Sequence, residues 1–219
     1  MTQYIVDTEH PLLISSGKVH LEGSLHIPKN AAGLVLFVHG SGSSRFSARN
    51  QHVARVLNDH KLATLLFDLL TSEEEKIDNH TRELRFDIDF LSSRLIDATQ
   101  WCHKQPAIKD FPIGYFGAST GGAAALVAAA QLGDLVKAVV SRGGRPDLAG
   151  KFLHQVKAAT LLIVGGNDHP VIEMNKDAFA NLTCLKEIKI VPGATHLFEE
   201  PGTLDEVAKL ARKWFVQYL

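Results

Sequence analysis

Hydrophobic and polar residues alternate along the first part of the chain. The alternation covers 4–7, 12–15 and 18–27, and His10-Pro11 and Ser16-Gly17 separate these stretches. A period of two residues, interrupted by proline and glycine, is typical of strands joined by turns. We therefore expect an antiparallel sheet edge in the N-terminal part of the chain.

From residue 33 onward the apolar runs become nearly continuous. They lie at 33–38, 63–67, 113–116, 136–140, 161–164 and 188–191. Runs of this kind are typical of parallel strands that are buried on both faces. Segments with helical spacing separate them, at 48–60, 87–104, 120–132, 171–181 and 204–219. This alternation predicts an α/β fold, with a mostly parallel central sheet and helices on both faces.

The composition favours one globular domain. Of the 219 residues, 45% are hydrophobic, which is enough to build one sizeable core. The chain has no internal repeat and no linker-like stretch. We therefore expect residues 1–219 to form a single domain.

Charge and cysteine content restrict the classes of partner. The 23 basic and 24 acidic residues almost cancel, so no overall field attracts nucleic acid or an anionic membrane. The first ten residues are unlike a secretory leader, and no stretch approaches the roughly 20 apolar residues that span a bilayer. Cys102 and Cys184 make neither a disulfide framework nor a metal cluster. We expect a cytoplasmic protein without nucleic-acid or membrane partners, and its oligomeric state stays open.

Polar and glycine-rich residues follow the predicted parallel strands. They occur at 39–45, 117–121, 142–145, 165–168 and 193–196. In open sheets of this kind, ligands bind at the carboxyl ends of the strands. We therefore expect these loops to form the functional edge of the sheet.

Ser119 is the candidate nucleophile in this set of loops. Gly117-Ala118-Ser119-Thr120-Gly121 is a Gly-x-Ser-x-Gly pattern between a predicted strand and a predicted helix. The glycines suit a tight turn in which side chains would collide with the strand or helix. The alternative is a plain glycine turn before a buried, alanine-rich helix.

Asp168 and His196 are the candidate acid and base. They follow Ser119 in the order Ser, Asp, His that α/β-hydrolases use. The imidazole of His196 would accept the serine proton, and the carboxylate of Asp168 would hold the ring and stabilise its charged form. The alternative for Asp168 is a helix N-cap, because Pro170 follows closely.

Two backbone amides are candidates for stabilising a developing oxyanion. They are the amide of Thr120, directly after the nucleophile, and that of Ser41 in the His39-Gly40-Ser41-Gly42 loop. The alternative for this loop is phosphate binding at a helix N-terminus. The chain lacks the Gly-x-Gly-x-x-Gly and Walker patterns, so a nucleotide-binding fold is a weak competitor.

Three arginines fall on the same predicted edge, which favours an anionic substrate. Arg45, Arg142 and Arg145 carry guanidinium groups suited to carboxylates and phosphates. The alternative is that they pair with acids such as Asp147 and only hold the loops. The charged residues 72–78 nearby are expected to form a solvated loop or a helical turn.

Together, these motifs resemble the α/β-hydrolase superfamily and, within it, the dienelactone-hydrolase-like group. Residues 40–50, 67–87 and 112–128 look like hydrolase domains that are sometimes joined to a phosphoribosyltransferase-like domain. The resemblance implies the α/β-hydrolase fold, a serine or cysteine nucleophile, and hydrolysis of esters, lactones or thioesters. True dienelactone hydrolases use cysteine, whereas this chain has Ser119. Only residues 142–157 are available for a cap between two strands, so we expect no large lid.

The sequence thus predicts a serine hydrolase that cleaves a small carboxylic ester, lactone or thioester through an acyl-enzyme on Ser119. This chemistry requires neither a metal nor an organic cofactor. Two alternatives stay open. One is a peptide or amide hydrolase, and the other is a hydrolase-like scaffold that binds a small molecule without turnover.

Overall fold

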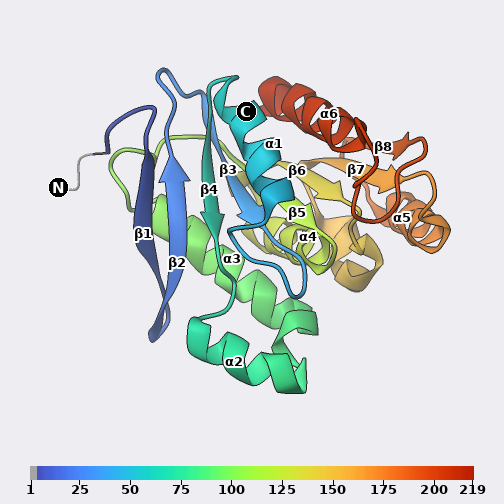
Figure 1. The fold of residues 1–219 in the computed structure, drawn as a ribbon, viewed down its shortest axis with the longest axis horizontal. Helices are drawn as coiled ribbons and strands as arrows, with labels where there is room; N and C mark the ends of the chain where they lie inside the picture. Colours follow the sequence, from blue (N-terminus) through green and yellow to red (C-terminus); the bar gives the residue numbers. More distant parts are fainter. Residues whose placement is uncertain (1–3) are drawn as a thin grey trace.

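One mixed sheet organises the molecule. The computed structural model describes residues 4–219, and eight strands of this part of the chain pair in the order β1-β2-β4-β3-β5-β6-β7-β8 (Figure 1). The strands are β1 (Glu9–Ser16), β2 (Val19–His26), β3 (Gly33–Val38), β4 (Leu62–Phe67), β5 (Ile113–Ala118), β6 (Val136–Arg142), β7 (Ala159–Gly165) and β8 (Lys186–Val191). Strand β2 is antiparallel to both β1 and β4, and all other neighbours are parallel. The mostly parallel sheet with an antiparallel N-terminal edge is confirmed.

The N-terminal edge differs from the prediction in its details. The strand expected at 4–7 is wrong, because this segment is irregular and turns at Asp7, where φ is 59°. Strand β1 instead runs through Pro11, which was expected to separate two strands. Pro11 faces Ser24 of β2, and no strand of the described part of the chain pairs with the other side of β1. A proline is tolerated there because an edge strand does not need every amide.

Helices cover both faces of the sheet, as expected. Helices α1 (Ala48–Asn58) and α6 (Thr203–Tyr218) pack on one face, around a cluster that includes Val53 and Phe215. Helices α3 (Ile88–Cys102), α4 (Thr120–Leu132) and α5 (His169–Asn181) pack on the opposite face. These helices bury apolar residues against the sheet, which provides the main stabilisation of such layers, and residues 120–129 of α4 are all buried.

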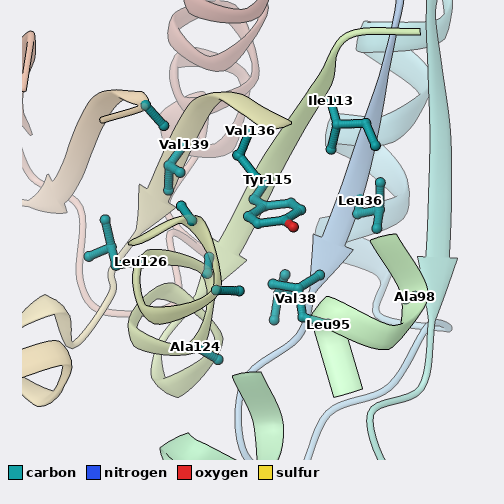
Figure 2. Close-up of a cluster of buried hydrophobic side chains, with 14 of the residues drawn as sticks. Leu36, Val38, Leu95, Ala98, Ile113, Tyr115, Ala124, Leu126, Val136 and Val139 are labelled. Atoms are coloured by element: carbon teal, nitrogen blue, oxygen red, sulfur yellow. The ribbon is translucent and has the colours of Figure 1, made fainter. Parts of the chain in front are cut away.

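Figure 2 shows the core between the sheet and helices α3 and α4. The ring of Tyr115 on β5 lies among aliphatic side chains and is fully buried. Its hydroxyl forms a 2.6 Å hydrogen bond with Oγ1 of Thr99 on α3. The buried phenol therefore has a partner, which avoids the cost of an unsatisfied polar group. Helix α4 is rich in alanine and glycine, and its first turn lies close to the strands of the sheet.

Short segments complete the carboxyl edge of the sheet. Residues 72–78, expected to be a solvated loop or helical turn, belong to the regular helix α2 (Ser72–Thr81), which lies below the arrowheads of β3 and β4 in Figure 1. Thr71 and Glu74 form a capping box that starts this helix. The 3-10 segments are η1 (Leu84–Phe86), η2 (Gly133–Leu135) and η3 (Pro146–Gln155). Only η3 lies between β6 and β7, so there is no large lid at this position. Within residues 4–219, no helix is long and apolar enough to cross a bilayer.

Candidate active site

Ser119 lies at the sharp turn between β5 and α4. Its backbone has φ 50° and ψ −123°, a conformation that residues with a side chain rarely adopt. The flanking glycines permit the turn. A Cβ atom on Gly117 would lie 2.5 Å from the carbonyl oxygen of Gly121, and one on Gly121 would lie 2.1 Å from that of Val38. The turn therefore raises the Ser119 side chain out of the buried sheet, as the Gly-x-Ser-x-Gly pattern predicts.

Asp168 and His196 meet at the same edge of the sheet. His196 lies in the loop after β8, and Asp168 lies in the loop after β7. Nδ1 of His196 is 2.7 Å from Oδ2 of Asp168. The Asp168 side chain is 13% exposed and that of His196 is 40% exposed. Asp168 occupies the N-cap position of α5, but its side chain makes no capping hydrogen bond. Its carboxylate is thus committed to the imidazole.

Ser119 and His196 line one open cleft of about 280 Å³. Because Nδ1 of His196 contacts Asp168, Nε2 is the ring nitrogen left for the serine. In the described part of the chain, no hydrogen bond joins Oγ of Ser119 to this ring. Such bonds are often long in unliganded enzymes and tighten when the substrate binds.

The predicted oxyanion loop lies directly against Ser119, the candidate nucleophile. A Cβ atom on Gly40 would lie 2.9 Å from Cβ of Ser119, so glycine is needed for this approach. Thr120 is the first residue of α4, and its amide precedes the first intrahelical hydrogen bond. The amide of Ser41, the second candidate donor to the oxyanion, donates to Oγ1 of Thr120 at 3.1 Å. The second donor is therefore held by a hydroxyl in this state.

His39 fixes the loop from its buried side. Its Nδ1 donates to the carbonyl oxygen of Gly40 at 3.0 Å, and its Nε2 accepts from the amide of Leu69 at 3.1 Å. Burial lowers the pKa of His39, which keeps the ring neutral and able to accept this bond. The imidazole thus ties the loop after β3 to the loop after β4.

Two of the three candidate arginines are engaged by carboxylates. Arg45 pairs with Glu22 and Asp68, and its amide also donates to Asp68 at 2.6 Å. Arg145 pairs with Asp147 at 2.8 Å, and the hydrogen bond to this carboxylate raises the pKa of Arg145. Neither side chain lines the Ser119 cleft. Both arginines therefore hold loops through ion pairs, which the sequence analysis gave as the alternative to substrate contact.

Arg142 behaves differently, because it lines the Ser119 cleft without an acidic partner among the described residues. It is 6% exposed, and Nη2 makes a long hydrogen bond of 3.5 Å to Oδ1 of Asn50. Arg49, which the sequence did not single out, lines the cleft as well. Arg49 follows the glycine-rich loop at the start of a helix, and this position could have indicated that it lies near the site.

Comparison with known proteins gives a consistent result. The sequence pattern of the dienelactone hydrolase family matches residues 48–217. A dienelactone hydrolase structure from Anabaena variabilis is 59% identical, covers 97% of this chain and 98% of its own, and has a TM-score of 0.96. Est1E of Butyrivibrio proteoclasticus, solved with ferulic acid bound, is 18% identical over 94% of this chain and 98% of its own, with a TM-score of 0.81.

Two relatives from strains of Mycobacterium tuberculosis carry the name of a phosphoribosyl transferase. Each is 56% identical over 206 residues, which make up 94% of this chain and 46% of the relative. The chain thus spans about half the length of the curated relatives it matches.

Proposed function

This chain belongs to the dienelactone hydrolase family, whose fold supports hydrolase activity, and we propose that it cleaves a small carboxylic ester, lactone or thioester through an acyl-enzyme on Ser119. One observation carries the proposal. Ser119 stands at a strained turn in the same cleft as His196, whose ring is bound to Asp168 at 2.7 Å. This set of groups suits nucleophilic catalysis at a carbonyl.

In the proposed reaction, Oγ of Ser119 attacks the carbonyl carbon while Nε2 of His196 takes its proton. The Asp168 carboxylate holds Nδ1–H and stabilises the imidazolium. The tetrahedral intermediate collapses when His196 returns the proton to the leaving oxygen or sulfur. Water then attacks the acyl-enzyme with His196 as base, which releases the acid and restores Ser119.

The developing oxyanion would accept hydrogen bonds from the amides of Thr120 and Ser41. In the unliganded structure the Ser41 amide donates to Oγ1 of Thr120. We infer that the oxyanion takes over or shares this donor. This change of acceptor favours the transition state, because the negatively charged oxyanion accepts a stronger hydrogen bond than the neutral hydroxyl of Thr120 does.

Neither cysteine competes with Ser119 for the nucleophilic role. Cys102 is buried in α3, and burial raises the pKa of its thiol. Cys184 lies before β8, where partial burial likewise raises the pKa. Thiols of this kind are poor nucleophiles, because the reactive form is the thiolate.

A fluorophosphonate probe tests the nucleophile, with intact-mass spectrometry and peptide mapping as readouts. We expect one adduct on Ser119, none in Ser119→Ala, and normal labelling in Ser93→Ala, a change on the exposed face of α3. A panel of p-nitrophenyl esters, thioesters, lactones and peptides then defines the bond that is cleaved. An unlabelled wild-type protein, or Ser119→Ala with full esterase activity, would refute the proposal.

A further inference from the structure

We propose that the Ser119 cleft contains a phosphoryl-binding site formed by Arg142, Arg49 and the N-terminal end of α1. The substrate would then carry a phosphate monoester close to the acyl group that is cleaved. The identity of the substrate rests on the proposed hydrolase function. Binding of the anion itself does not require Ser119.

Arg142 is a buried cation without a carboxylate partner among residues 4–219. Its side chain leaves the end of β6 and is almost completely enclosed. Nε has no hydrogen-bond partner, and the guanidinium lies 5.9 Å from the centre of the Phe198 ring. Burial, followed by the charge of Arg49, lowers the pKa of Arg142 to about 10, so the group is still charged at neutral pH. A buried charge without a partner is costly, and an anion in the cleft would remove that cost.

Arg49 supplies the second positive charge. It is close enough to Arg142 to disfavour the charged form of that residue. Its Nε is also buried without a hydrogen-bond partner. Its terminal nitrogen reaches Glu199 at 3.4 Å, but the Glu199 side chain is 64% exposed. Such a surface pair is weak, so Arg49 is available to a ligand.

The N-terminal end of α1 adds backbone donors to the two guanidinium groups. Ser47, Arg49 and Asn50 all line the cleft. The Ser47 side chain accepts from the Asn50 amide, and its carbonyl accepts from Gln51. The amides of Ala48 and Arg49 precede these bonds and lie at the positive end of the helix dipole. A helix start of this kind favours phosphate groups.

The charge of the site favours a phosphoryl group over a carboxylate. No aspartate or glutamate is among the described residues that line the cleft, while two arginines are. A phosphate monoester carries a charge of about −1.5 to −2 at pH 7 and three acceptor oxygens. A carboxylate has one charge and two oxygens. The phosphate monoester therefore offers the two guanidinium groups more charge and more acceptor oxygens than a carboxylate does.

Isothermal titration calorimetry on Ser119→Ala measures anion binding without turnover. We expect methyl phosphate to bind at least about tenfold more tightly than acetate. Arg142→Gln and Arg49→Gln, each placed in the Ser119→Ala background, should weaken methyl phosphate binding about tenfold or more. Arg55→Gln, the same change at an exposed position of α1, serves as the matched control. Equal binding of acetate, or unchanged affinity in both cleft variants, would overturn the site.

Inhibition of ester hydrolysis shows whether the anion lies in the substrate cleft. With p-nitrophenyl butyrate as substrate, methyl phosphate should inhibit the wild type competitively, and Arg49→Gln should raise the inhibition constant about tenfold. Arg49→Gln changes a partly exposed side chain, so it keeps the test valid if Arg142→Gln fails to fold. Noncompetitive inhibition would place the anion elsewhere and overturn the proposal.

The two proposals fail in distinguishable ways. If methyl phosphate binds to Ser119→Ala but the wild type hydrolyses no ester, the anion site stands and the hydrolase proposal fails. If the wild type hydrolyses p-nitrophenyl butyrate but methyl phosphate does not bind, the hydrolase proposal stands and the anion site fails.

Discussion

Replacing Ser119 with glycine should make the protein more stable than replacing it with alanine. Both changes remove the Ser119 hydroxyl, so the difference reports the backbone conformation and the contacts of one Cβ atom. At φ 50° and ψ −123° a residue with a Cβ atom stores about 1–3 kcal/mol of strain, which glycine lacks. Glycine loses about 0.5–1 kcal/mol more than alanine in conformational entropy on folding. We therefore expect Ser119→Gly to exceed Ser119→Ala by about 1 kcal/mol, or about 2–4 °C in Tm for a chain of this size.

Urea unfolding followed by circular dichroism measures this difference. The matched control is the pair Ser93→Gly and Ser93→Ala, at an exposed helical position of α3 where glycine should be about 1 kcal/mol less stable. The sign of the difference thus reverses between the two sites. If glycine is also the less stable residue at position 119, the turn is not strained and our account of the nucleophile is wrong.

Three further predictions concern the groups around Ser119. Asp168→Asn should lower kcat about 10²–10⁴-fold with little change in KM, as steady-state kinetics would show, because the amide does not stabilise the imidazolium. Acidification below about pH 6.5 should destabilise the wild type, since the unfolded chain takes up a proton that the buried His39 resists. His39→Gln should remove this part of the pH dependence, measured as the difference in unfolding free energy between pH 7.5 and 5.5. Gly121→Ala should cost about 3 kcal/mol or prevent folding, because its Cβ would overlap the Val38 carbonyl.

Each of these predictions has an outcome that contradicts it. An Asp168→Asn enzyme with wild-type kcat would mean that another group orients His196. An identical pH dependence in His39→Gln would mean that His39 titrates equally in both states. If Gly121→Ala unfolds at the same urea concentration as the wild type, the contact with the Val38 carbonyl relaxes and the overlap is not costly.

The parallel part of the fold was predictable because a strand that is buried on both faces has a continuous run of apolar residues. Continuous apolar runs such as Gly33–Val38 coincide with the observed strand. The turn at Ser119 was predictable as well, because close backbone contacts require glycine on both sides of it. The Gly-x-Ser-x-Gly pattern lies within five consecutive residues, so it is visible in the sequence although Gly121 contacts Val38 on another strand.

Features that depend on distant partners were not predictable. Arg45, Arg142 and Arg145 are equivalent as sequence symbols, but only Arg142 faces Asn50 rather than a carboxylate. Residues 72–78 have no apolar stripe, so the spacing of hydrophobic residues does not predict helix α2. Its capping box, Thr71 with Glu74, was a local signal that would have revealed the helix.

The ion pairs of Arg45 have a consequence for how the protein can diverge. Strand β2 lies between β1 and β4, next to the edge of the sheet. Here Glu22 on edge-side strand β2 and Asp68 after β4 hold the same arginine, which lies in the loop that carries Ser41. Replacing Glu22 or Asp68 would leave Arg45 with one carboxylate partner fewer, so we expect these three charged positions to vary together.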